Sequence, residues 1–176
     1  MLDCQTPTGK KFISHEVNVK NILSDKLNIR IDQPDLLTSH DDGFIYKGQQ
    51  LIGVCEIKTR PYWSRDKKTP FTLKRFLNDG DGYLITGWKL TWLRDQSKKN
   101  NIYSYIFLNI PHDESIVKFR VARQSGDFFI KYNTKNSTTY YSANDYKGKT
   151  QRLNAYIPYK ENEKHIEIIK YGLSST

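Results

Sequence analysis

The sequence predicts an α/β fold with one central sheet and a β-rich C-terminal third. Apolar residues recur at a three-to-four spacing over residues 10–27, which is typical of an amphipathic helix. Residues 42–58 form two strand-like runs around a turn at 47–50, which is typical of a β-hairpin. From residue 116 onward, short runs of β-branched and aromatic residues alternate with glycine, asparagine and serine, which indicates further strands.

The expected elements follow from local patterns along the chain. After the first helix we expect a short strand at 29–31, ended by Pro34 because proline lacks a ladder donor, and then the hairpin. The rest of the expected core, residues 1–114, is a short helix at 70–78, a strand at 83–86, a helix at 87–98 and a buried strand at 102–110. In the elaboration 115–176, packed on the same domain, strands are expected at 116–121, 128–132, 138–141, 153–159 and 166–171. We expect Trp88 and Trp92, four residues apart, to lie in the core.

Composition restricts the class of protein. The chain has 176 residues, enough for one domain with its own core, and its net charge of +9 favours a polyanionic partner such as nucleic acid. The two cysteines, Cys4 and Cys55, form no disulfide framework, which favours a reducing, cytoplasmic setting. No signal-peptide pattern is present, and the longest apolar run, at 102–110, is too short to cross a bilayer, so we expect no membrane partner.

The open ends of the hairpin carry the candidate chemistry. Glu56 and Lys58 share one face of the second strand while Ile57 points to the other, and Asp41 and Asp42 stand where the first strand begins. An antiparallel hairpin brings these ends together, so two carboxylates and an ammonium converge. Two carboxylates so close repel unless a cation lies between them or one is protonated. A hard divalent ion with oxygen ligands is the natural partner.

Two registers of this hairpin remain open from the sequence. If the turn centres on Gly48-Gln49, the numbers of paired residues sum to 97 and Asp41 faces Glu56. With one more residue in the loop the sum is 98 and Asp42 faces Glu56. As the candidate carboxylate that faces Glu56, Asp42 ranks first and Asp41 second. Asp35, in the dipeptide Pro34-Asp35, ranks third because it comes too early for the end of the hairpin.

The string Asp42, then Glu56-Ile57-Lys58 fourteen positions later, resembles the PD-(D/E)xK nuclease superfamily, which includes restriction enzymes and Holliday-junction resolvases. The order helix, hairpin, helix, strand over residues 10–110 is similar as well. Glu16 matches the glutamate that many members carry on the first helix. The resemblance implies a restriction-endonuclease-like core with a catalytic hairpin, whereas residues 115–176 match no module.

The resemblance also implies a Mg²⁺-dependent DNA nuclease, with Mn²⁺ as a substitute. Asp42, Glu56, the backbone carbonyl of Ile57 and Glu16 would bind the metal, and Lys58 would orient water and offset charge that develops on the phosphate. Cleavage would leave a 5′-phosphate and a 3′-hydroxyl, with endonuclease favoured over exonuclease and a homodimer suited to cutting two strands. RNA stays open as a substrate. Composition and compactness favour a bacterial or phage source.

The segment after the hairpin interleaves cations with aromatic residues, which suits phosphate contacts and base stacking. The expected nucleic-acid-binding residues are Arg60, Tyr62, Trp63, Arg65, Lys67, Lys68 and, from the next helix, Lys89. The ordinary alternatives are a solvated loop whose aromatic residues pack on the core, and a plain surface lysine at 89. The second hypothesis for the whole chain is a non-cleaving module on a nuclease-like fold that binds nucleic acid or protein. The third is a structural, β-rich interaction protein.

Overall fold

The computed structural model describes residues 7–32, 43–61, 69–80, 82–140 and 149–172. Its longer helices are α1 (Pro7–Leu27) and α3 (Gly87–Asn100), with short helices α2 (Leu73–Asn78) and α4 (Tyr159–Asn162). Its strands are β1 (Arg30–Asp32), β2 (Gly43–Lys47), β3 (Gln50–Thr59), β4 (Tyr83–Thr86), β5 (Tyr103–Ile110), β6 (Ser115–Ala122), β7 (Asn133–Tyr140), β8 (Lys149–Ile157) and β9 (Ile166–Lys170). The expected α/β class is confirmed.

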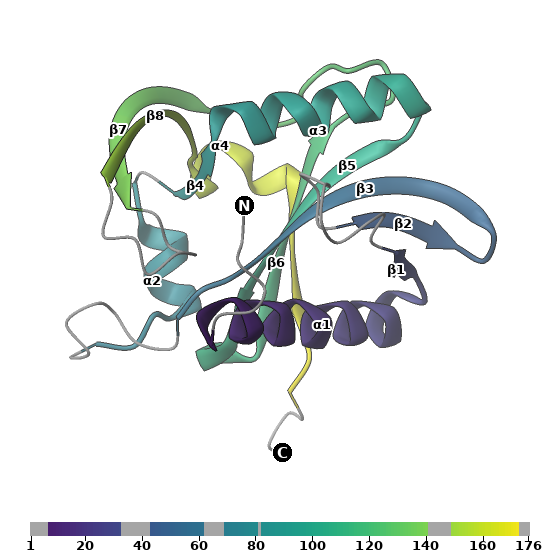
Figure 1. Cartoon of the computed structure of the whole chain (residues 1–176), viewed down its shortest axis with the longest axis horizontal. Coiled ribbons are helices and arrows are strands. Elements are labelled where there is room, and N and C mark those ends of the chain that lie inside the picture. The colour runs from purple at the N-terminus through teal and green to yellow at the C-terminus, as the bar shows by residue number, and fades with distance from the viewer. Residues whose placement is uncertain (1–6, 33–42, 62–68, 81, 141–148, 173–176) are drawn as a thin grey trace.

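A mixed, six-stranded sheet forms the centre of the molecule, in the order β1-β2-β3-β5-β6-β9. Strands β3 and β5 are parallel, and the other neighbours in this sheet are antiparallel. A parallel pair requires a long crossover, which α2, β4 and α3 supply here. Helices α1 and α3 lie on opposite sides of the sheet (Figure 1).

Strand β3 lies between β2 and β5 and is buried on both faces. Cys55 and Ile57 pack in one apolar cluster with Val19 and Leu23 of α1. Val54 packs in a second cluster on the other side, which contains residues of α3. Because side chains alternate along a strand, Glu56 and Lys58 belong to the face that α3 covers.

A second sheet, in the order β4-β8-β7, is antiparallel and has three strands. Strand β4 comes from the first part of the chain and β8 from the C-terminal third, and β6 and β9 of that third extend the central sheet. Both sheets therefore combine strands from the two parts of the sequence. Helix α3 begins at Gly87, directly after β4 ends at Thr86, so the second sheet positions the start of α3.

The β2–β3 hairpin contains both of the registers considered from the sequence. Next to the turn, Lys47 pairs with Gln50 and the residue numbers sum to 97. A β-bulge follows, and beyond it Gly43 pairs with Cys55, so the sum becomes 98. The bulge places Ile52 as the extra residue of β3.

Most expected elements are present within a few residues of their predicted bounds, but two expectations are wrong. Residues 128–132 form no strand: within the described chain they make a single bridge, Ala122 with Phe128, because a turn containing Gly126 folds the chain back on β6. Trp88 is 47% exposed rather than part of the core. Among the described residues, no helix is both long enough and apolar enough to cross a membrane.

Candidate functional site

Glu56 lies near the middle of the central sheet and is 2% exposed, although it is charged. The Nζ atom of Lys89 lies 2.5 Å from each of its carboxylate oxygens. The Nζ atom of Lys58 lies 2.9 Å from Oε1. The structure thus holds one buried carboxylate between two ammonium groups, and we name these three residues the Glu56 cluster.

Two elements, β3 and α3, build this cluster, and strand alternation orients the two members on β3. Glu56 and Lys58 project from β3 toward α3, and Lys89 projects back toward them from the first turn of that helix. Lys58 keeps 48% of its side chain exposed and Lys89 20%. The cluster therefore runs from the buried carboxylate outward to solvent along the Lys58 side chain.

The pKa of Glu56 reflects opposing effects. Burial raises the pKa of this carboxyl, but the two neighbouring ammonium groups favour its charged form and outweigh burial, so that the pKa lies below its usual value of 4.5. Glu56 is consequently an anion at neutral pH. A carboxylate in this state is the form that a hard cation or an ammonium group binds.

The lowered pKa predicts how stability depends on pH. The ion pairs of Glu56 stabilise the fold fully above about pH 4.5, and this contribution is lost as pH falls through the lower pKa of the folded state. Glu56→Gln removes it, so we expect the variant to be less stable than wild type at pH 7 by on the order of 2 kcal/mol. The difference should shrink below pH 4.5. Urea unfolding of both proteins at pH 7 and pH 3 measures this, and a difference that is unchanged at the lower pH contradicts it.

The structure does not bring Glu16 to the Glu56 cluster. Glu16 lies on α1, with its Oε1 atom 2.7 Å from Nζ of Lys20 one helical turn away. Helix α1 packs on the Cys55 and Ile57 face of β3, and alternation sends the Glu56 carboxylate to the other face. The other expected site residues, Asp42 with its alternatives Asp41 and Asp35, and Tyr62, Trp63, Arg65, Lys67 and Lys68, lie outside the described residues.

Arg60 follows β3 and keeps the strand pairing, because its backbone N–H donates to the carbonyl of Asn109 at 2.9 Å. The guanidinium carbon lies 5.2 Å from the ring centre of Phe71 and 5.9 Å from that of Tyr83. Its Nε–H group is buried and donates to no hydrogen-bond acceptor among the described residues. Arg60 is thus a second cation on this end of β3, with a donor that an anionic ligand could engage.

Lys89, which the sequence predicts to contact nucleic acid, pairs in the structure with the carboxylate of Glu56. A signal for this orientation exists in the helix pattern. Leu93 and Ser97 follow Lys89 at four-residue spacing, and both are buried, so position 89 shares the helix face that meets the sheet. Trp88, exposed beside it, lies with its ring centre 5.9 Å from the ammonium of Lys89.

The donor set for a metal is small within the described chain. No group of three or more histidine, cysteine, aspartate or glutamate side chains gathers among these residues. Glu56 supplies a buried, deprotonated carboxylate, the ligand type that Mg²⁺ requires, and the ammonium of Lys89 now contacts both of its oxygens. Comparison with protein-family models, curated proteins and solved structures finds no match for this chain.

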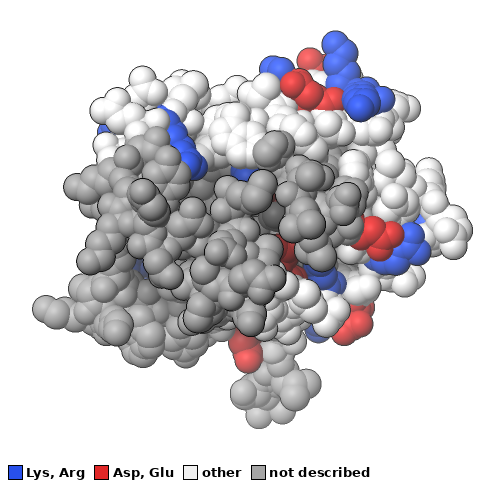
Figure 2. Space-filling model, viewed as in Figure 1, with Lys and Arg blue, Asp and Glu red and all other residues white. Residues whose placement is uncertain are grey.

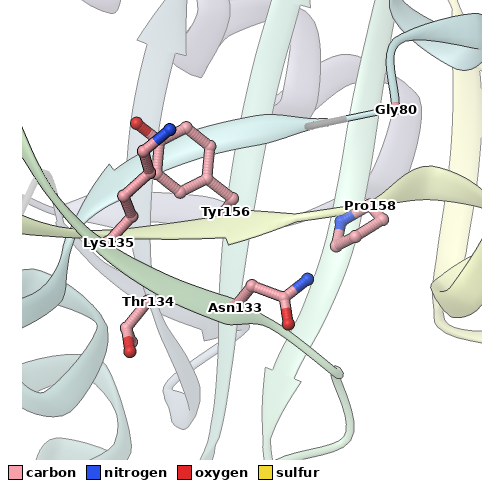
Figure 3. Close-up of a pocket in the computed structure, with 6 residues that line it drawn as sticks. All are labelled: Gly80, Asn133, Thr134, Lys135, Tyr156 and Pro158. Atoms are coloured by element: carbon pink, nitrogen blue, oxygen red, sulfur yellow. The ribbon is translucent and has the colours of Figure 1, made fainter.

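A hollow on the second sheet and the distribution of charge are two further features of the surface. A hollow of about 230 Å³ on the second sheet is lined by Gly80, Asn133, Thr134, Lys135, Tyr156 and Pro158 (Figure 3). Asn133 pairs with Tyr156 across β7 and β8, which places these two side chains on one face of that sheet. On the side of the molecule shown in Figure 2, the described basic and acidic side chains form small mixed groups.

Proposed function

We propose that this protein is a Mg²⁺-dependent DNA nuclease with a restriction-endonuclease-like core. The observation that carries the proposal is the buried, anionic Glu56 with Lys58 two residues further along a central strand. A charged group in such a place is costly unless it is paired and used. Asp42, one residue before Gly43 in the sequence, is proposed as the second carboxylate.

The topology supports this proposal. Helix α1, the antiparallel strands β1, β2 and β3, the crossover helix α3 and the parallel strand β5 follow one another in the order expected for that core. The cluster lies where such a core would need it, on the strand that joins the hairpin to the parallel pair. The topology therefore agrees with the motif.

The side chains of the cluster suit distinct roles in phosphodiester hydrolysis. Glu56, with Asp42 and the carbonyl of Ile57, would hold Mg²⁺, which when bound polarises the scissile phosphate and acidifies a coordinated water. Lys58 reaches from the carboxylate toward solvent, where it can contact the phosphate and that water. The guanidinium of Arg60, whose Nε has no hydrogen-bond partner among the described residues, is a further candidate for a phosphate contact.

A non-cleaving nucleic-acid-binding module is the second candidate. It is favoured by one observation: both oxygens of Glu56 already contact ammonium groups, so the cluster is electrostatically satisfied with no metal. In that case the charges would serve stability and phosphate binding. An assay of DNA cleavage separates the two candidates.

The test is cleavage of plasmid, linear and branched DNA with Mg²⁺ or EDTA. We expect Mg²⁺-dependent cutting, and a loss of roughly 100-fold or more in Lys58→Ala because an interaction with the transition state is removed. Cutting of circular plasmid would identify an endonuclease. Lys47→Ala, at an exposed lysine beside the hairpin turn, is the matched control and should cut like wild type. Binding of DNA with no cutting in any metal would support the module and refute the nuclease.

A further inference from the structure

A second cationic surface lies on the other face of the central sheet. It consists of Tyr103, Tyr105, Lys118, Arg120, Arg123 and Phe129, and we name it the cation–aromatic platform. Tyr103 and Tyr105 alternate along β5 with residues that face α3. They share the face of Phe107, which packs in the cluster beneath α1. The platform extends this face beyond that cluster, and Tyr105 packs against the cluster as well.

The strand pairing extends the platform from β5 onto β6. Arg120 lies opposite Tyr105, and Lys118 lies opposite Phe107, so both cations share the face of the tyrosines. Arg120 and Arg123 are exposed, while Tyr103 and Phe129 are partly exposed. Long basic side chains and aromatic rings are therefore presented together to solvent.

Cations and rings are interleaved in the platform. The guanidinium carbon of Arg120 lies 5.9 Å from the ring centre of Tyr103 and 5.3 Å from that of Phe129. The guanidinium carbon of Arg123 lies 4.7 Å from the ring centre of Phe129. The rings of Tyr103 and Phe129 are 6.2 Å apart between centres and inclined by 29°. A hollow of about 450 Å³ here is lined by Tyr103, Arg120, Arg123, Gln124, Ser125 and Phe129.

The positive charge of the platform is not balanced within the described residues. Glu167 pairs with Lys118 at 2.8 Å, and the carboxylate of Asp127 accepts from the hydroxyl of Ser125 at 2.7 Å. The guanidinium groups of Arg120 and Arg123 have ring contacts there but no ion pair or side-chain hydrogen bond. Their donors remain available to an anion.

The neighbouring histidine responds to this charge. His165 lies with its ring centre 5.2 Å from that of Phe129. Its pKa is lowered, first by desolvation and then by the positive charges of Lys164, Arg120 and Arg123. The platform thus disfavours the protonated form of His165, which agrees with the excess of positive charge there.

We propose that the cation–aromatic platform binds single-stranded nucleic acid. Arg120 and Arg123 would contact phosphates, and the rings of Tyr103 and Phe129 would stack with unpaired bases. A duplex fits less well because its bases already stack on one another and present no open face. An acidic peptide would match the charge but not the rings. This site lies on the opposite face from the Glu56 cluster and does not depend on the nuclease proposal.

Fluorescence anisotropy tests the proposal with three labelled probes: oligothymidylate, oligouridylate and a duplex. Each is about a dozen nucleotides long, since this length matches known single-strand sites. EDTA is included so that cutting cannot interfere. We expect Arg120→Gln/Arg123→Gln to weaken single-strand binding at least tenfold. Two lost phosphate contacts should also reduce the slope of log affinity against log salt by about 1.4. Lys26→Gln/Lys47→Gln removes the same charge from exposed sites toward the β1–β2 edge of the sheet and should cost less than threefold.

The aromatic part of the proposal has its own test. Tyr103→Ala should weaken oligothymidylate binding about tenfold and leave duplex binding nearly unchanged, because only open bases stack. Crosslinking of wild type to an oligonucleotide with 5-iodouracil, followed by peptide mapping, should mark Tyr103 or Phe129 without any substitution. The proposal would be overturned by crosslinks at other residues or by wild-type affinity in the double arginine variant. Binding of polyglutamate as strong as that of the oligonucleotide would overturn it as well. Failure of the protein to cut DNA would not contradict the proposed binding of single strands.

Discussion

Glu56→Gln is expected to abolish Mg²⁺-dependent DNA cleavage while DNA binding is kept or becomes tighter. The amide keeps the size of the side chain but cannot offer a charged oxygen to a metal, so we expect a loss of roughly 1,000-fold or more in rate. The same change leaves two lysines without their carboxylate, which increases positive charge toward the phosphate backbone. Opposite effects on binding and cutting would distinguish a catalytic carboxylate from a structural one.

The control for this experiment is Glu161→Gln, which makes the same charge change at an exposed position of α4. Both variants gain one unit of net charge, so both should bind DNA at least as well as wild type, and Glu161→Gln should still cut. Gel assays of plasmid cleavage and anisotropy with labelled duplex measure the two properties. Glu56→Gln that cuts at the wild-type rate would contradict the proposed role of this carboxylate.

Gly82→Ala is expected to destabilise the fold by more than about 3 kcal/mol. Gly82 has a φ of +71°, and a β-carbon there would lie 2.0 Å from the carbonyl oxygen of Ile157 and 2.7 Å from Cα of Pro158. Those atoms belong to the backbone at the end of β8, so they cannot turn aside as a side chain would. Tyr83, which pairs with Ile157 and is 2% exposed, would be displaced from the core as well.

Gly80→Ala is the matched control for Gly82→Ala, because a β-carbon at Gly80 meets nothing within 4 Å. We expect its free energy of unfolding to stay within about 0.5 kcal/mol of wild type. Urea denaturation monitored by circular dichroism compares the two variants. Equal stability of both would show that the backbone at the end of β8 shifts to accommodate the added methyl group.

Local patterns were enough to predict the hairpin, both long helices and the shared face of Glu56 and Lys58. These features depend on periodicity and alternation, which short stretches of sequence carry. The pairing of Lys89 with Glu56 depends instead on where the crossover places α3, a tertiary property. The register could not be chosen from the turn because a bulge changes it along the hairpin. At 128–132, aromatic residues that favour strands serve ring contacts in a loop.

The bulge at Ile52 has a consequence for how this hairpin tolerates insertions and deletions. Strand β3 is held along seven residues by its parallel partner β5, from Gly53 to Thr59, whereas β2 pairs over five. A residue gained or lost at the turn would therefore slide β2 rather than β3. A change of turn length would then leave the orientation of Glu56 unchanged, and the readjustment would fall on β2 and on β1, which pairs with it.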